Sequence, residues 1–475
     1  MELHFYNSCV SATIRRFAIW LRDNRYGLFL MALVVGLGSA LGALAFRFLV
    51  LGFTWLATGY QQFGAAGRIA STHLPWLGPA FYVVIPVVGG ALYGPIVHRW
   101  AREARGHGVP EVMLAVAEKG GRIRPRVAAV KALASALTIG TGGSVGREGP
   151  IVQIGAALAS SLGQALRLPT SRLRILVACG AAGGISATFN APITGVFFGA
   201  EIILREISAG SLFAIMLSSM VADAVIRPLL GGAPFLAQFP HGASLHHSVD
   251  FALVAVLAVI AAVIGQLFKW VLYSTEDLCD RLWAGRPEWL QPAVGGVLVG
   301  IVLLVFPQMY GVGYPVMFKA LGGDYTVWLI VLLAAAKIFT TSLTLGVGGS
   351  GGVFAPSLFV GLMTGTAFGL VADQVFGTAA GSPALYAAIG MAGVFVSGTR
   401  APLTGLASVV EMTGDFSLVL PVMLTAGVST IVSRSLSYGT IYTQKLLRRG
   451  QDIERLQDFE YRRMLHARGD EPSAA

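Results

Sequence analysis

Residues 131–156 read KALASALTIGTGGSVGREGPIVQIGA, and residues 337–362 read KIFTTSLTLGVGGSGGVFAPSLFVGL. Extended without a gap to residues 163 and 369, the two stretches have eleven identical positions at an offset of 206 residues. Self-similarity at a fixed offset is the signature of repeated structural units. The sequence therefore predicts a chain built from two related halves.

Shorter blocks on either side repeat in the same order. GHGVP at 106–110 pairs with GVGYP at 311–315, and APITG at 191–195 pairs with APLTG at 401–405. Glu201 pairs with Glu411 by the same alignment. Coincidence in a glycine-rich chain is a poor explanation for four blocks in one order, so the repeat is taken to extend over most of the chain.

The composition is that of a membrane protein. Of the 475 residues, 55% are hydrophobic and only 12% are charged, whereas a soluble chain is about a quarter charged. A bilayer core needs about 20 apolar residues per helix. Runs of this kind lie at Tyr26–Tyr60, Leu77–Val97, Ser208–Ile226, Phe251–Leu272, Leu290–Phe306 and Val327–Leu345. We predict an all-α polytopic membrane protein, embedded in the lipid bilayer.

Basic residues gather at the two ends of the chain and in the loop from Arg99 to Lys131. Loops rich in Lys and Arg stay in the cytoplasm. Both termini are therefore expected to be cytoplasmic in a multi-pass protein of the cell (inner) membrane. Because the basic residues lie in loops and tails, the net charge of +10 does not indicate nucleic-acid binding. The predicted parts are a cytoplasmic segment (1–26), a first transmembrane repeat (27–230), a loop (231–249), a second repeat (250–442) and a cytoplasmic tail (443–475).

The cysteines and the N-terminal residues give no sign of a metal site, a disulfide or a signal peptide. The three cysteines, Cys9, Cys179 and Cys279, have neither metal-ligand nor disulfide spacing. The first 25 residues contain no compact apolar stretch or cleavage site, so no signal peptide is expected.

The repeated segments are interrupted where glycines precede Pro150 and Pro356. Proline is favoured in the first turn of a helix, so each interruption predicts a new helix start. Paired interruptions in a duplicated membrane unit indicate inverted repeats whose broken, re-entrant-like helices meet at a midplane binding site. Unpaired backbone N–H groups and the helix dipole favour a negative ion at such a start, so the substrate should be an anion.

These residues closely resemble the CLC family of chloride channels and chloride/proton antiporters. GHGVP at 106–110 resembles its first signature, GREGP at 146–150 matches the second, and GVFAP at 352–356 matches the third. Tyr442 is the best match for a C-terminal tyrosine, with Tyr438 as the competing choice of register. Because the chain ends soon after Arg463, the paired regulatory nucleotide-binding modules of many relatives are not expected, as in a bacterial member.

The resemblance implies a homodimer with one pore per subunit, bound chloride ions, and no enzyme activity, cofactor or metal site. It places Glu148 in the pore as a gate whose carboxylate mimics an anion and swings away when protonated. Anion-binding positions carried over from the three motifs and the tyrosine are His107, Gly108, Gly146, Arg147, Gly149, Val353, Phe354, Ala355 and Tyr442. For Arg147 a structural role beside backbone or Glu148 is favoured, and Tyr442 could instead be an interfacial anchor.

His107 departs from the family pattern, which usually has serine at this position. A neutral imidazole donates one hydrogen bond, and protonation adds a second donor and a charge. We hypothesise that His107 lines the inner mouth and makes anion entry sensitive to pH. The alternative is a solvated loop histidine.

Ile202 is a second departure, because well-coupled antiporters of the family usually carry a proton-relaying glutamate there. Glu201 and Glu206 are the remaining proton-relay candidates, although the repeat partner of Glu201 suggests a structural role. The sequence slightly favours chloride/proton antiport, with a passive gated chloride channel as the alternative. Nitrate remains open because of His107, and fluoride is disfavoured by Pro150. An intramembrane serine protease centred on Ser350 is remote, since no histidine is placed as its base.

Overall fold

The structure, a computed structural model, describes residues 19–455 apart from 23, 62, 64–70, 237–238, 240–247 and 378–379. This part is almost entirely helical, with two isolated β-bridges and no strand. The helices of the first half are α2 (Arg25–Thr58), η1 (Pro75–Ala80), α3 (Phe81–Trp100), η2 (Arg102–Ala104), α4 (Val109–Ala117), α5 (Arg126–Gly140), α6 (Glu148–Ala165), α7 (Thr170–Phe189), α8 (Pro192–Phe197), η3 (Phe198–Leu204) and α9 (Ala209–Leu230).

The second half repeats this order. Its helices are α10 (Ser248–Leu282), η4 (Glu288–Leu290), α11 (Gln291–Val305), η5 (Pro307–Met309), α12 (Tyr314–Leu321), α13 (Val327–Gly346), α14 (Phe354–Phe376), α15 (Pro383–Thr399), α16 (Pro402–Thr413), η7 (Phe416–Leu418) and α17 (Val419–Leu436), followed by α18 (Thr443–Leu447). The prediction of two related halves is confirmed: α5 and α6 correspond to α13 and α14, and the short α4 corresponds to α12.

Within the described residues, nine helices are long and apolar enough to cross a bilayer, which confirms the polytopic all-α prediction. All six predicted apolar runs fall in these helices. Sequence analysis missed the spans Thr170–Phe189, Phe354–Phe376 and Phe416–Leu436. In the first two of these, 78% of the apolar window is buried in the protein. Such helices face other helices rather than lipid, and in Thr170–Phe189 small residues replace the large apolar ones that hydropathy detects.

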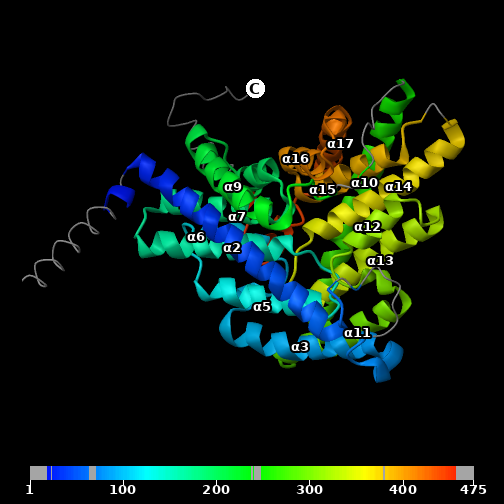
Figure 1. The fold of residues 1–475 in the computed structure, drawn as a ribbon, viewed down its shortest axis with the longest axis horizontal. Coiled ribbons are helices and arrows are strands. Elements are labelled where there is room, and N and C mark those ends of the chain that lie inside the picture. Colours follow the sequence, from blue (N-terminus) through cyan, green and yellow to red (C-terminus); the bar gives the residue numbers. More distant parts are fainter. Residues whose placement is uncertain are drawn as a thin grey trace, which may run out of the picture.

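Figure 1 shows the two halves side by side, with α2 to α9 on one side and α10 to α14 on the other. Helices α3 and α11, which are equivalent in the two halves, pack against each other along one edge of the molecule. The expectations for residues 1–18 and 456–475, including the absence of a signal peptide and of regulatory modules, concern segments outside the described residues.

Candidate anion pathway and gate

The glycine-rich loops of the two halves pair with each other at the centre of the molecule. Gly146 and Gly352 exchange backbone hydrogen bonds, with N···O distances of 2.7 and 2.6 Å, and form an antiparallel bridge. Gly106 forms a parallel bridge with Ser350, through backbone hydrogen bonds to Gly349 and from Gly351. These contacts bring the N-termini of α6 and α14 together, as the broken-helix interpretation requires.

Two buried lysines hold the loops from equivalent positions. Lys131 Nζ donates to the carbonyl oxygens of Ala104 and Gly106, at 2.9 and 2.6 Å. Lys337 Nζ donates to the carbonyl oxygen of Gly311, the repeat partner of Gly106, at 3.1 Å. Each Nζ therefore fixes carbonyl oxygens of the loop that precedes a short helix, α4 or α12.

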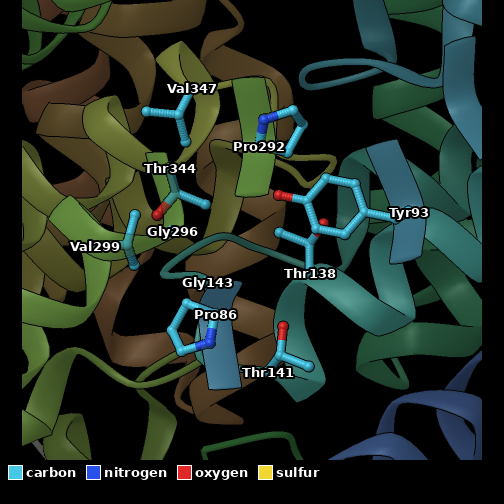
Figure 2. A pocket seen from close by; sticks show the side chains of 10 residues that line it. All are labelled: Pro86, Tyr93, Thr138, Thr141, Gly143, Pro292, Gly296, Val299, Thr344 and Val347. Atoms are coloured by element: carbon cyan, nitrogen blue, oxygen red, sulfur yellow. The ribbon is translucent and has the colours of Figure 1, made fainter. Parts of the chain in front are cut away.

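The threonines near the ends of α5 and α13 link the halves, because the hydroxyl of each accepts a backbone hydrogen bond from the other half. The Thr344 hydroxyl accepts from the Ser144 N–H at 3.3 Å, and the Thr138 hydroxyl accepts from the Ser350 N–H at 3.2 Å. Figure 2 shows both threonines lining a small cavity of about 10 Å³. Its walls come from α3, α5, α11, α13 and Gly143, so the cavity belongs to the seam between the halves rather than to the gate.

Glu148 is fully buried and its side chain bridges the two halves. Its Oε2 accepts from the N–H of Ala355, in the first turn of α14, at 3.3 Å. Its Oε1 accepts from the Tyr314 hydroxyl at 2.6 Å. The carboxylate of the first half therefore lies at the helix start of the second half, where a small anion would be stabilised by the same N–H group and dipole.

Glycine is required around this carboxylate. A Cβ atom on Gly146 would lie 2.1 Å from Glu148 Oε2, so any side chain would push the carboxylate out of its position. A Cβ atom on Gly149 would lie 2.1 Å from the carbonyl oxygen of His107. Gly146 thus permits the inward position of Glu148. Gly149 permits the close approach of the first motif, at His107, to the GREGP motif.

Apolar side chains surround the start of α14. Val353, Phe354 and Ala355 are buried, and the Phe354 ring lies 4.7 Å from the ring centroid of Phe395 and 5.3 Å from that of Phe189. Their side chains form walls, while the backbone supplies the polar groups. Low-dielectric surroundings of this kind strengthen the attraction of a helix start for an anion.

His107 and Tyr442 lie together in the interior, with ring centroids 6.1 Å apart. Both are buried, and neither His107 Nδ1 nor the Tyr442 hydroxyl has a hydrogen-bond partner among the described residues. Tyr438 is instead exposed and donates to Asp452 at 3.0 Å. The geometry supports Tyr442 rather than Tyr438 as the pore tyrosine, and it disagrees with the alternative of His107 as a solvated loop residue.

The proton on His107 is positioned by Tyr273. The Tyr273 hydroxyl donates its single proton to the carbonyl oxygen of Ile441 at 2.6 Å. His107 Nε2, 3.3 Å from that hydroxyl oxygen, must then carry a proton and donate it. In the neutral ring Nδ1 is therefore bare, and it becomes a donor only when the imidazole is protonated.

Arg147 contacts two aromatic rings and a backbone carbonyl oxygen. Its guanidinium lies 5.5 and 5.4 Å from the ring centroids of Phe235 and Tyr314, and Nη2 donates to the Thr188 carbonyl oxygen at 3.3 Å. These contacts support the structural role considered for Arg147, with its charge near Glu148 as a secondary effect.

Glu201 and Glu411 cap each other's helices. Glu201 accepts from the backbone N–H groups of Leu403 and Thr404, at 3.2 and 2.8 Å, at the start of α16. Glu411 accepts from Ile193 and Thr194, at 2.9 and 2.6 Å, at the start of α8. The carboxylates satisfy helix N-termini across the repeat, which supports the structural interpretation of Glu201.

Comparison with known proteins agrees with this architecture. The family model described as "Voltage gated chloride channel" matches residues 89–434. This chain belongs to the CLC family. The resemblance in the three motifs is thereby confirmed.

Members of the CLC family match over most of the chain. A putative ClcB-like chloride channel protein of Ralstonia nicotianae is 30% identical over 428 residues, which are 89% of this chain and 97% of that protein. The H(+)/Cl(-) exchange transporter ClcA of Salmonella arizonae is 32% identical over 430 residues, 88% of each chain.

Solved CLC structures share the fold. A slow cyanobacterial Cl-/H+ antiporter superposes with a TM-score of 0.78 at 23% identity and covers 89% of this chain and 97% of its own. A CLC-type fluoride/proton antiporter superposes with a TM-score of 0.72, also at 23% identity, and covers 88% and 97%. The predicted fold of two inverted repeats is that of this family.

In this CLC chain, Ile202 lines a polar pocket of about 360 Å³ together with Tyr442. Glu454, which sequence analysis did not consider, lies on the same pocket and accepts from the Thr443 hydroxyl at 2.9 Å. Glu206 is exposed after η3 and does not line it. No motif points to Glu454, because the C-terminal segment that carries it has no counterpart in the repeat.

Ser350 has the contacts of a structural residue. Its hydroxyl donates to the Ala104 carbonyl oxygen at 2.6 Å and lies 2.8 Å from the Ser135 hydroxyl. A nucleophilic serine needs a base within hydrogen-bond reach, and neither contact is one. The geometry thus gives no support to the protease alternative.

Proposed function

We propose that this protein exchanges chloride for protons across the inner membrane, with Glu148 as the moving gate. The observation that carries the proposal is the Glu148 carboxylate at the start of α14, bonded to the Ala355 N–H and the Tyr314 hydroxyl. A carboxylate and a chloride ion compete for these donors. Protonation of Glu148 removes its charge, weakens both bonds and frees the position for chloride.

A second chloride position is proposed between His107 and Tyr442. Two buried polar atoms that lack partners are costly unless a ligand satisfies them. The Tyr442 hydroxyl and a protonated His107 Nδ1 are both suitable donors for an anion. Gly108, which directly precedes α4, would contribute backbone atoms to this second position. Gly146, Gly149 and Val353 would instead shape the position occupied by Glu148.

A passive chloride channel is the second candidate, and Ile202 favours it. An apolar side chain at this point of the Tyr442 pocket cannot carry a proton. The pocket is nevertheless lined by two glutamates, Glu454 and Glu201, whose carboxyl groups are able to carry protons, so exchange is preferred.

Assembly and orientation complete the proposal. As a CLC member, the chain is proposed to form a homodimer in which each subunit has its own pore, with both termini in the cytoplasm. Each subunit contains the Glu148, Ala355 and Tyr314 contacts within one chain, so a pore does not need residues from a partner.

Flux from liposomes tests the gate. In the wild type, an outward chloride gradient should drive protons uphill, recorded by a pH electrode beside a chloride electrode. Glu148→Gln should keep chloride flux and lower proton movement by at least roughly tenfold, because an amide is not a proton carrier. Chloride flux without proton movement in the wild type would establish the channel, and coupled proton movement in Glu148→Gln would refute the gate.

A further inference from the structure

The Tyr314 hydroxyl is in direct contact with the proposed gate. It donates to Glu148 Oε1 at 2.6 Å, a distance typical of a strong bond between a hydroxyl and a carboxylate. The other oxygen of the carboxylate accepts from the Ala355 N–H at 3.3 Å. Both donors belong to the second half of the chain, and the phenol makes the shorter bond.

The ring of Tyr314 is held in place before any anion arrives. Gly313 precedes it in the left-handed region, with φ of 100°, and starts α12. The Phe235 ring packs edge-on at 4.6 Å between centroids, and the Arg147 guanidinium lies 5.4 Å from the Tyr314 centroid. A ring packed against Phe235 and Arg147 keeps its hydroxyl directed at one point, so the donor is pre-organised.

The charged groups near Glu148 are used elsewhere. Arg147 is stacked on the aromatic rings and bonded to the Thr188 carbonyl oxygen. Lys337, the cation of α13 nearest the gate, donates to Ser144 Oγ, to Gly311 O and to Val312 O. The Tyr442 hydroxyl, whose ring lies beside His107, makes no hydrogen bond within the described chain. Tyr314 thus supplies the side-chain donor of the gate position.

We propose that Tyr314 has two roles at one point: a latch that holds the charged Glu148 in the pore, and a ligand for the chloride ion that replaces it. The inference rests on the proposed gate function of Glu148. The chemistry is the same in both states, because a hydroxyl that donates to a carboxylate also donates to a halide ion in that place.

The ligand role is tested by binding, without transport. In Glu148→Ala the carboxylate is gone, and chloride titrated calorimetrically into detergent-solubilised protein should occupy the vacated position. Adding Tyr314→Phe to this background should weaken chloride binding roughly tenfold, the effect of one charge-assisted hydrogen bond. Equal affinity in Glu148→Ala and in the double variant would overturn the ligand role.

The latch role is tested by the pH dependence of chloride flux with Glu148 intact. The phenol stabilises the charged carboxylate, so the gate is released only when the pH falls far enough to protonate it. Tyr314→Phe removes this donor, and the half-maximal pH of chloride flux should rise by about one unit. An unchanged profile would overturn the latch.

Tyr310→Phe is the matched control, because Tyr310 is a buried tyrosine of the same connection whose hydroxyl donates to the Gly140 carbonyl oxygen at 2.7 Å. It should change neither chloride affinity nor the pH profile, and equal effects of the two variants would reduce Tyr314 to a structural role. Phe235→Leu keeps the phenol but removes its packing partner, and should shift the profile in the same direction by less. If the wild type moves no chloride, the proposed function fails, while the calorimetric comparison still decides whether Tyr314 binds chloride.

Discussion

If chloride binds between His107 and Tyr442 as proposed, the histidine makes that position sensitive to protons. Serine at this position would offer a hydroxyl at every pH. The imidazole offers a donor toward Tyr442 only when protonated, because Tyr273 already engages Nε2. Binding of an anion and binding of a proton at His107 should therefore favour each other, as linkage requires.

His107→Ser is accordingly expected to reduce the acceleration of chloride flux by acid on the side that His107 faces. The loss should be roughly tenfold at low pH, since a bond to a charged donor contributes about 1.5–3 kcal/mol. Burial and the charges of Lys445 and Lys131 lower the pKa of His107 well below its usual value of 6.5, so flux measured at increasingly acidic pH below 6.5 provides the check. His98→Ser is the control, because His98 pairs with Glu288 at 3.4 Å at the end of α3. The same pH profile for wild type and His107→Ser would contradict the role of His107.

Single residues of the site could be predicted where they lie in a repeated motif. Glu148, Ala355 and the surrounding glycines were placed in this way. Tyr314 was not, although it lies in the quoted block 311–315, because its repeat partner is Val109 and has no hydroxyl. The contact with Glu148 spans 166 residues and depends on side-chain direction, which no local pattern encodes.

At the scale of helices, the starts of the broken segments were predictable in physical terms. Pro150 and Pro356 lie in the first turn of α6 and α14, where a missing N–H group costs nothing. Buried spans such as α7 were missed because small residues replaced the large apolar ones. The seven-residue π-helix η3, which carries Glu201, also had no signal in the sequence.

The exchange of caps between the halves leads to a prediction on stability. Glu201→Gln and Glu411→Gln should each lower the free energy of unfolding by about 1–2 kcal/mol, since each removes a charged cap from two N–H groups. Thermal unfolding in detergent should show similar losses for the two variants, because the geometries are equivalent.

Glu206→Gln is the control for these caps. Because Glu206 is exposed, this substitution should leave the free energy of unfolding unchanged. Proton coupling should survive in Glu201→Gln. A Glu201→Gln variant of full stability that has lost coupling would instead make Glu201 the proton relay.

At the scale of the whole molecule, the polar pocket beside Tyr442 joins parts that are far apart in the sequence. Ile202 from η3 and Glu454 from the C-terminal segment both line it, together with arginines of both halves. The repeat predicted the fold of the two halves, but a segment outside the repeat supplies this carboxylate. The site is therefore less predictable than the fold that supports it.

If Glu454 conducts protons in place of a carboxylate at position 202, Glu454→Gln should slow coupled proton movement by at least roughly tenfold while chloride flux continues. Ile202→Glu in the same protein should restore coupling, because both positions line one pocket. Asp452→Asn, which changes a nearby carboxylate bonded to Tyr438, is the control. Full coupling in Glu454→Gln, measured with paired chloride and pH electrodes, would exclude this route.

The dependence of Glu148 on partners from the other half also bears on how the protein is made. Tyr314 and Ala355 leave the ribosome 166 and 207 residues after Glu148. At about 5–20 residues per second, translation needs roughly ten to forty seconds for that interval. A nascent first half that is already in the membrane contains Glu148 but not Tyr314, the residue proposed to hold it. It also lacks the α14 helix start that would attract an anion, so the proposed anion position and the donors that hold Glu148 are completed by the same late segment.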